Sequence, residues 1–103
     1  MITTHVLDTA LGKPAQGIPV RLELREKQGW TLVGDGVTDA DGRLRTLVTG
    51  PLRAGTYRLT FETRKRSAFF PEVSITFEVA DTGAHYHVPL LLSPFGYSTY
   101  RGS

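Results

Sequence analysis

The histidines are the residues of this sequence whose type and spacing best suit chemistry. There are three of them, His5, His85 and His87. An imidazole titrates near neutral pH, so it can accept or donate a proton during a reaction. If residues 85–87 are extended, His85 and His87 point to the same face, because successive strand residues alternate between faces. One or two of the three are expected to be structural, and we interpret His85, where that strand begins, in this way.

Three imidazoles also meet the minimum for a catalytic zinc site, and a His-x-His pair is one way to place two ligands. However, no nearby Asp or Glu provides the outer hydrogen bonds that orient such ligands. Residues 39–42, Asp-Ala-Asp-Gly, resemble a fragment of a calcium loop but lack its later oxygen ligands and terminal Glu. We therefore expect no metal and no other cofactor, and we interpret residues 39–42 as a tight turn.

Two arginines follow this turn. Arg43 and Arg45 are two positions apart, so they share one face of any strand that begins there. From their positions alone, both are interpreted as solvated edge residues, as is the basic run at residues 64–66. No nucleophile stands out, because the sequence has no cysteine, no Gly-x-Ser-x-Gly elbow and no glycine-rich spacing that would hold phosphates.

Strands are expected to position these side chains, because apolar residues recur with a period of two. The alternation is clear in residues 18–25, 57–62 and 73–79, and none of these segments has the 3.6-residue period of a helix. Turn-forming residues separate roughly seven or eight such segments, which is typical of a β-sandwich. Only residues 64–70 suit a short helical turn, which Pro71 would end.

One predicted strand, residues 86–93, is apolar on both faces. Tyr86, Val88, Leu90 and Leu92 lie on one face, and the other carries His87, Pro89 and Leu91. In a small sandwich such a strand needs a second cover, which another subunit would provide. Pro89 has no N–H, so it is expected at a sheet edge or a bulge. The pattern predicts an oligomer interface at this strand.

Length and composition narrow the class of protein. A chain of 103 residues is long enough for one domain, residues 1–103, and too short for two. The formal charge of +2 is weak support for a nucleic-acid or membrane partner, so we expect neither. We find no apolar run of about 18 residues and no secretory signal at the N-terminus. Without cysteines the chain suits a reducing compartment, and we expect it in the cytoplasm.

Three segments resemble those of a known family. They are residues 4–9 with 12–15 (Thr-His-Val-Leu-Asp-Thr and Gly-Lys-Pro-Ala), residues 38–43 (Thr-Asp-Ala-Asp-Gly-Arg), and residues 85–94 with 97–103 (His-Tyr-His-Val-Pro-Leu-Leu-Leu-Ser-Pro and Tyr-Ser-Thr-Tyr-Arg-Gly-Ser). Together they closely resemble the 5-hydroxyisourate hydrolases, the transthyretin-like proteins of urate catabolism. The terminal Tyr-Arg-Gly-Ser is the most specific part, being characteristic of the hydrolases and absent from hormone-carrying transthyretins.

The resemblance implies a transthyretin-like (prealbumin-like) sandwich with at most one short helix, assembled as a homotetramer, a dimer of dimers whose sites lie where two dimers meet. It implies His5, Arg43 and His87 as the catalytic centre. The implied substrate-binding residues are His5, Arg43, Tyr100, Arg101, Gly102 and Ser103. Asp39 stands where the family often has Asn, and residues 64–71, where the family's helix would fall, look shorter than usual.

The implied reaction is a metal-independent hydrolysis. Water attacks a ring carbonyl of 5-hydroxyisourate and opens the six-membered ring, giving 2-oxo-4-hydroxy-4-carboxy-5-ureidoimidazoline. Arg43 would stabilise the oxyanion, and His5 or His87 would move the protons. The main alternative is a non-catalytic transthyretin-like carrier of a small ligand. A metal-dependent hydrolase using His5, His85 and His87, or a purely structural sandwich, are further alternatives.

Overall fold

The computed structural model describes residues 1–48 and 50–103, and in these ranges all regular secondary structure is β. The strands are β1 (Ile2–Asp8), β2 (Lys13–Pro14), β3 (Pro19–Glu26), β4 (Gly29–Val37), β5 (Arg43–Leu44), β6 (Gly55–Glu62), β7 (Glu72–Val79), β8 (Tyr86–Ser93) and β9 (Gly96–Thr99). The predicted all-β fold is confirmed. No helix within the described ranges is long and apolar enough to cross a membrane.

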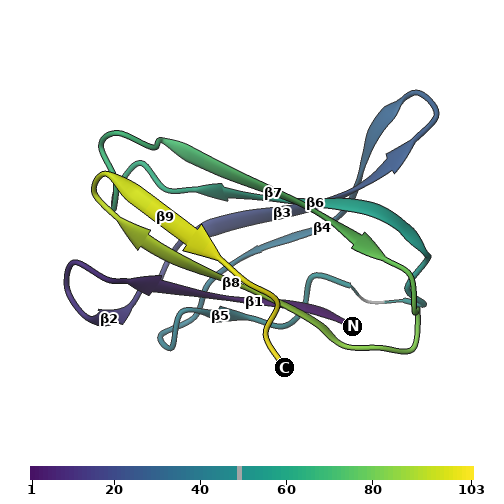
Figure 1. Cartoon of the computed structure of the whole chain (residues 1–103), viewed down its shortest axis with the longest axis horizontal. Helices are drawn as coiled ribbons and strands as arrows, with labels where there is room; N and C mark the ends of the chain where they lie inside the picture. Colours follow the sequence, from purple (N-terminus) through teal and green to yellow (C-terminus); the bar gives the residue numbers. More distant parts are fainter. Residues whose placement is uncertain (49) are drawn as a thin grey trace.

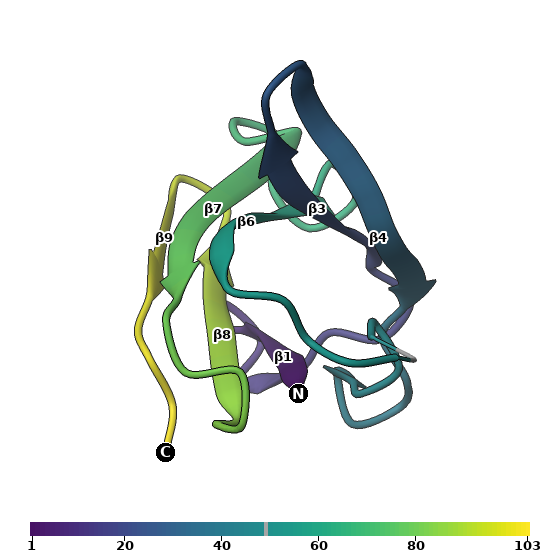
Figure 2. The same ribbon diagram turned by 90° about the vertical axis from the view of Figure 1, so that its right-hand side faces the viewer.

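Two sheets face each other to form the sandwich (Figure 1). The first has the order β2-β1-β8-β9, with β5 also paired to β1, and the second has the order β4-β3-β6-β7. Strands β1 and β8 are parallel neighbours, so the first strand of the chain pairs with the second-to-last strand in the middle of the first sheet. Strands β9 and β7 form edges of the two sheets along one side of the molecule (Figure 2).

The core consists of the apolar residues that alternate along the strands. Val20, Leu22, Leu59 and Phe61 are at most 1% exposed. Burying a side chain of this size stabilises the fold by roughly 1.5–3 kcal/mol. The burial of these alternating apolar side chains is therefore the main contribution to the stability of the sandwich. In β7 only the two ends of the predicted apolar face are fully buried, because β7 is an edge strand.

Residues 64–70 form a single turn rather than a helix. The N–H groups of Arg66 and Ser67 both donate to the carbonyl of Thr63, at 2.9 and 2.8 Å, and the pattern stops there. Ser67 then donates its hydroxyl to the carbonyl of Pro94, and Arg66 pairs with Asp8 at 3.2 Å. The expected helical turn is therefore present, but it is too short to be a helix.

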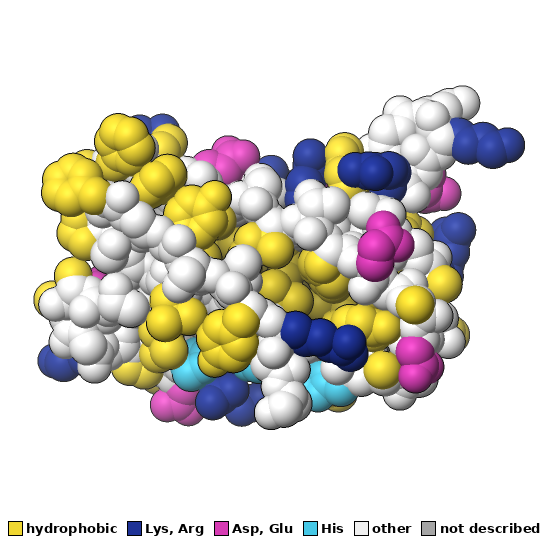
Figure 3. All heavy atoms as spheres, in the orientation of Figure 1, with side chains coloured by type: hydrophobic (Ala, Val, Ile, Leu, Met, Phe, Trp, Pro, Cys, Tyr) yellow, Lys and Arg dark blue, Asp and Glu magenta, His cyan; other side chains and the backbone are white. Residues whose placement is uncertain are grey.

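An aromatic cluster closes the same end of the sandwich. Phe69 packs against Phe70 and Phe95, and Phe70 packs edge-on against Tyr97. These contacts hold the turn at residues 64–70 against the β8–β9 hairpin. The yellow side chains at the upper left of Figure 3 gather at this end of the molecule.

Strand β8 is apolar on both faces, as predicted, but its place in the sheet differs from the one expected from Pro89. Tyr86, Val88, Leu90 and Leu92 face the core as predicted. β8 lies between β1 and β9, and its register with β9 is the same at Leu90 and at His87, so the prediction that Pro89 sits at a sheet edge or a bulge is wrong. The missing N–H is accommodated differently. Regular pairing of β8 with β9 stops at Leu90 and Thr99 and resumes only as the single bridge between His87 and Gly102. The interruption falls at Pro89.

Candidate active site

Strand register brings the candidate residues onto one face of the first sheet. Strand β1 has β8 on one side and β5 on the other. His5 lies opposite Arg43 of β5, and Thr3 lies opposite His87 of β8. Thr3 and His5 are two positions apart, so they share a face. Segments more than 30 residues apart in the sequence therefore contribute to one surface.

This surface contains a hollow of about 290 Å³ near the chain termini. It is lined by Met1, Thr3, Thr4, Arg43, Arg45, His85, His87 and Ser103. In Figure 3 the cyan histidine side chains lie along the lower edge, on the side of β1 and β5, close to dark blue basic groups. The hollow thus combines two guanidinium groups with two imidazoles.

The turn before β5 fixes the backbone position of Arg43. The Oδ1 atom of Asp39 accepts N–H bonds from Asp41 at 2.9 Å and Arg43 at 3.0 Å. The bond from Arg43 is the main cause that lowers the pKa of Asp39 below its ordinary value. An Asn side chain carries the same acceptor atom, which explains why Asp replaces it here without loss of the turn. Since Oδ1 binds backbone N–H groups, residues 39–42 are a turn, as predicted.

Gly42 completes this turn in a way that no other residue can. Its φ is +74°, in the left-handed region that favours glycine. A Cβ placed there would lie 2.4 Å from the carbonyl oxygen of Val6, in β1. The Gly42 carbonyl in turn accepts the Val6 N–H at 2.8 Å. The close approach holds the turn, and with it Arg43, against β1.

His5 is held by the same turn. Its Nε2 lies 2.8 Å from the backbone carbonyl oxygen of Asp41. A carbonyl oxygen only accepts hydrogen bonds, so Nε2 must carry the proton. In the neutral ring Nδ1 is then the unprotonated nitrogen. The ring of His5 is half-buried beside Arg43, although it does not line the hollow itself.

His87 is the half-buried imidazole of the hollow. Its Nδ1 lies 2.8 Å from the hydroxyl of Thr3. Burial lowers its pKa below the ordinary value of 6.5, and the positive charge of Arg43 is the next cause. His85, His5 and Arg45 lower the pKa further. The neutral form of His87 therefore predominates at neutral pH, which is the form that accepts a proton.

The residues of the C-terminal tail lie at two different hollows. The Gly102 N–H donates to the His87 carbonyl at 2.8 Å, and Ser103 lines the hollow. The Arg101 guanidinium instead stacks 4.4 Å from the ring of Tyr86. Tyr100 and Arg101 line another hollow, shared with Ile75 and Phe77 of β7. In the single chain they are thus apart from Arg43 and His87, and their contact with substrate stays a prediction.

Several lining residues were not selected from the sequence. Thr3 lies two residues before His5, and Arg45 lies two residues after Arg43, so the strand period was the available signal. His85, interpreted as structural, lines the hollow and lies 2.7 Å from the Thr3 hydroxyl. Among residues 1–48 and 50–103, no three His, Cys, Asp or Glu side chains are grouped as metal ligands.

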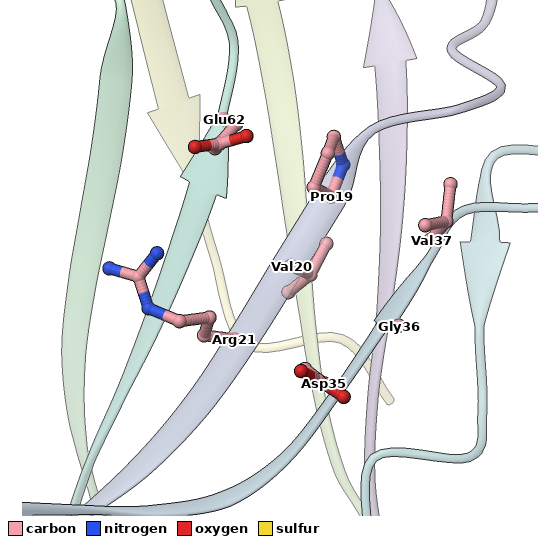
Figure 4. A pocket seen from close by; sticks show the side chains of 7 residues that line it. All are labelled: Pro19, Val20, Arg21, Asp35, Gly36, Val37 and Glu62. Carbon is pink, nitrogen blue, oxygen red and sulfur yellow. The ribbon is translucent and has the colours of Figure 1, made fainter.

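A second hollow, of about 360 Å³, lies on the other sheet (Figure 4). It is lined by Pro19, Val20, Arg21, Asp35, Gly36, Val37 and Glu62. Figure 4 shows its three charged side chains, Arg21 of β3, Asp35 of β4 and Glu62 of β6, with Arg21 pointing away from Asp35. None of its lining groups ordinarily titrates near neutral pH, so it is less suited to proton transfer than the hollow of His87.

The chain is similar to known proteins over nearly its whole length. Residues 2–102 match the model of the HIUase/Transthyretin family. The chain is 46% identical over 110 residues to a 5-hydroxyisourate hydrolase of Salmonella typhimurium, covering 100% of this chain and 81% of the relative.

Solved structures of the same fold include a hydrolase and a transthyretin in complex with thyroxine. A 5-hydroxyisourate hydrolase of Klebsiella pneumoniae superposes with a TM-score of 0.85 at 38% identity, covering 99% of this chain and 98% of the other. Sea bream transthyretin in complex with thyroxine has a TM-score of 0.89 at 32% identity, covering 98% and 93%. The predicted transthyretin-like fold is confirmed, and the chain belongs to the HIUase/Transthyretin family.

Proposed function

We propose that this chain is a 5-hydroxyisourate hydrolase that opens the substrate's six-membered ring. One observation carries the proposal: Arg43 and His87 line a single hollow with the terminal Ser103. The similarity to hydrolases of the same name supports it. Urate catabolism, implied by the substrate, is the proposed pathway, and the cytoplasmic location stays a prediction.

The chemistry assigns a task to each group. Water attacks a ring carbonyl, and the Nε2 atom of neutral His87 takes a proton from it. The carbonyl oxygen becomes an oxyanion, which the permanent charge and planar donors of Arg43 stabilise. The carbon–nitrogen bond then breaks, and the leaving nitrogen receives a proton. His5, with Nε2 donating to Asp41, orients the substrate through Nδ1.

The charge of the site suits this reaction. Arg43 and Arg45 both line the hollow, so developing negative charge is favoured there. The same two charges, together with burial, keep His87 neutral and able to act as a base. The same two arginines therefore favour both the removal of a proton from water by His87 and the formation of the oxyanion.

Absorbance during urate oxidation tests the function. Urate oxidase releases 5-hydroxyisourate, whose slow spontaneous decay is followed in the ultraviolet. Adding a small amount of this protein is expected to accelerate the decay over many turnovers, and a chelator is expected to leave the rate unchanged. An unchanged rate of decay in the presence of folded protein would exclude the proposed enzymatic function.

A carrier is the second candidate, because sea bream transthyretin in complex with thyroxine shares the fold. A carrier binds its ligand stoichiometrically and does not turn it over. Substrate in large excess over the protein separates the two functions. Continued acceleration of the decay after one equivalent excludes the carrier, whereas saturation at one equivalent or less supports it.

The proposal includes a homotetramer. On the face of β8 opposite the core, Leu91 is only half-buried in one chain, and its apolar surface is proposed to be covered by another subunit. Tyr100 and Arg101, which line a different hollow from His87 in one chain, are proposed to reach the substrate-binding region through this assembly. Light scattering during size-exclusion chromatography measures the mass, and a value four times that of the chain is expected.

Replacing Gly102 by alanine is expected to reduce kcat by about 10- to 100-fold. A Cβ at this position would lie 2.5 Å from Cδ2 of His87, closer than carbon atoms can approach. Either the imidazole or the tail must move, and a shift of about 1 Å at a catalytic group costs up to about a hundredfold in rate. Steady-state turnover measures the change.

Gly50→Ala is the matched control, because nothing lies within 4 Å of a Cβ built there. We expect wild-type turnover from it. Equal kcat for Gly102→Ala and Gly50→Ala would contradict the close contact between the tail and His87.

A further inference from the structure

The hydroxyl of Thr3 lies between two imidazoles. Its Oγ1 is 2.7 Å from Nε2 of His85 and 2.8 Å from Nδ1 of His87. Thr3 is 4% exposed, so its hydroxyl has little access to water. Among residues 1–48 and 50–103, these two rings are the hydrogen-bonding partners of the hydroxyl. The placement of its one hydrogen atom therefore determines which ring nitrogens carry protons.

Counting hydrogen atoms restricts the neutral rings to two arrangements. The hydroxyl can donate one hydrogen bond, so at least one of the two rings must donate to it. If both rings donated, the hydroxyl hydrogen would be buried without an acceptor, which is costly. Either His85 donates and the hydroxyl donates to His87, or His87 donates and the hydroxyl donates to His85. Only the second arrangement leaves Nε2 of His87 without a proton.

The charges around the hollow favour the second arrangement. With Nδ1 bound to Thr3, Nε2 is the nitrogen through which His87 can contact a molecule in the hollow. Arg43 and Arg45 line the same hollow, and both act on His87 as positive charges. A bare nitrogen is the negative end of the imidazole dipole, whereas an N–H group is the positive end. The two guanidiniums therefore stabilise a bare Nε2 over a protonated one.

We propose that Thr3 and His85 are positioning residues that hold His87 in the tautomer with a proton on Nδ1 and a bare Nε2. The proposal rests on the proposed hydrolase function. His85 accepts the hydroxyl hydrogen at its Nε2, so the oxygen of Thr3 is free to accept the Nδ1–H of His87. The Nδ1 atom of His85 then carries a proton, which the exposed ring can donate to solvent. The role resembles that of the group that orients the histidine of a hydrolytic triad.

No proton moves along this line of hydrogen bonds, and the site returns to its starting state after each turnover. The bare Nε2 of His87 takes a proton from water while the water oxygen bonds to the ring carbonyl carbon. The imidazolium keeps its Nδ1–H on Thr3, and this bond is stronger because the donor is charged. Nε2 then gives its proton to the leaving nitrogen as the carbon–nitrogen bond breaks. The new carboxylic acid ionises after release, and His87 is again neutral with its proton on Nδ1.

Nitrogen NMR of the neutral imidazoles tests the assignment without substrate, because the chemical shifts of Nδ1 and Nε2 show which nitrogen carries the proton. In mildly alkaline buffer we expect His87 and His85 to have the proton on Nδ1. His5 is the internal reference, since its Nε2 donates to the Asp41 carbonyl and must carry the proton. A proton on Nε2 of His87 in the wild-type protein would overturn the proposal.

Thr3→Val removes the hydroxyl and keeps the shape of the side chain. We expect kcat to fall by about 10- to 100-fold, because Nδ1 of His87 loses its acceptor and the ring is no longer held in the orientation that catalysis requires. The proton of His87 is expected to shift toward Nε2 in the same variant. Thr3→Ser restores the hydroxyl and is expected to recover most of the rate. Thr60→Val, at a buried threonine of the second sheet, is the matched control and is expected to keep wild-type kcat.

His85 is tested by a pair of variants that differ in their ability to accept a hydrogen bond. Leucine has no acceptor, so in His85→Leu the hydroxyl of Thr3 is left to donate to Nδ1 of His87. We expect this variant to place the proton of His87 on Nε2 and to lower kcat by at least about 10-fold, because the wrong tautomer removes the base. Glutamine offers an amide oxygen, so His85→Gln is expected to restore the tautomer and most of the rate. A role of His85 in packing alone would leave the tautomer of His87 unchanged in both variants.

The positioning role and the hydrolase function fail on different results. If His87 has the expected tautomer but the wild-type protein does not hydrolyse 5-hydroxyisourate, the hydrolase function fails and the assigned hydrogen bonds stand. If the protein hydrolyses this substrate but Thr3→Val keeps wild-type kcat, the positioning role alone fails. A loss of rate in Thr3→Val that serine does not repair would also overturn the role of the hydroxyl.

Discussion

Replacing His87 by asparagine is expected to lower kcat by about 10²–10⁴-fold, the usual contribution of a general base. The His87→Asn variant is the informative one because the asparagine amide reaches the position of Nδ1 and can still hydrogen-bond to Thr3. It has no atom at the position of Nε2, which is the nitrogen assigned to the attacking water. The variant thus removes the base while keeping the local hydrogen bond, and stopped-flow turnover measures the loss.

Folding and assembly are the controls for this variant. The His87 backbone carbonyl that accepts the Gly102 N–H is unchanged by the substitution, so the tail is expected to stay in place. Circular dichroism and the solution mass are therefore expected to match those of the wild type. Turnover near that of the wild type would remove His87 from the mechanism.

The pH dependence of kcat/KM gives an independent view of the same residue. The base must be neutral to accept a proton, so activity falls as the pH drops through its pKa. Burial and Arg43 lower the pKa of His87 from 6.5, so the acid limb is expected below pH 6.5. In His87→Asn, residual activity is expected to lose this limb. An acid limb that persists unchanged would assign it to another group, such as His5.

The fold was largely predictable because its strands bury one face. Residues 18–25, 57–62 and 73–79 alternate apolar and polar side chains, and they correspond to β3, β6 and β7. The alternation depends only on the pleat of a strand, so it is visible without knowledge of neighbours. It does not reveal which strands pair, and the parallel pairing of β1 with β8 could not be deduced from it.

Pro89 shows the limit of rules for single residues. A missing N–H excludes regular pairing at that position. The rule cannot tell an edge strand from an interior strand whose partner is locally interrupted. Here β8 is interior, and its pairing with β9 stops at Leu90 before resuming at His87.

The candidate site was predicted mainly through family resemblance. His5, Arg43 and His87 lie on segments that meet only because β1 pairs with both β5 and β8. Thr3 has an ordinary side chain for a buried strand, and its importance follows from two distances that no sequence pattern encodes. Tyr100 and Arg101 are the converse case, since they are adjacent to Gly102 in sequence yet lie against a different hollow.

Replacing Arg43 by glutamine is expected to lower kcat by about 10²–10³-fold, the usual effect of removing one oxyanion donor. Glutamine keeps an amide donor but has no charge, and it cannot form the two-pronged contact of a guanidinium. The same change is expected to move the acid limb of kcat/KM to higher pH, because the charge of Arg43 is one of the causes that lower the pKa of His87. The rise is expected to be partial, since burial, the larger cause, remains.

Arg64→Gln is the matched control, because Arg64 is exposed in the turn after β6 and is not among the charges that shift the pKa of His87. It loses the same charge from the chain, and we expect neither kcat nor the acid limb to change. The two readouts of Arg43→Gln then separate its two roles. A shifted limb with full kcat would limit Arg43 to tuning His87, whereas a lower kcat with an unshifted limb would limit it to the oxyanion. If neither changes, Arg43 does not take part in the reaction.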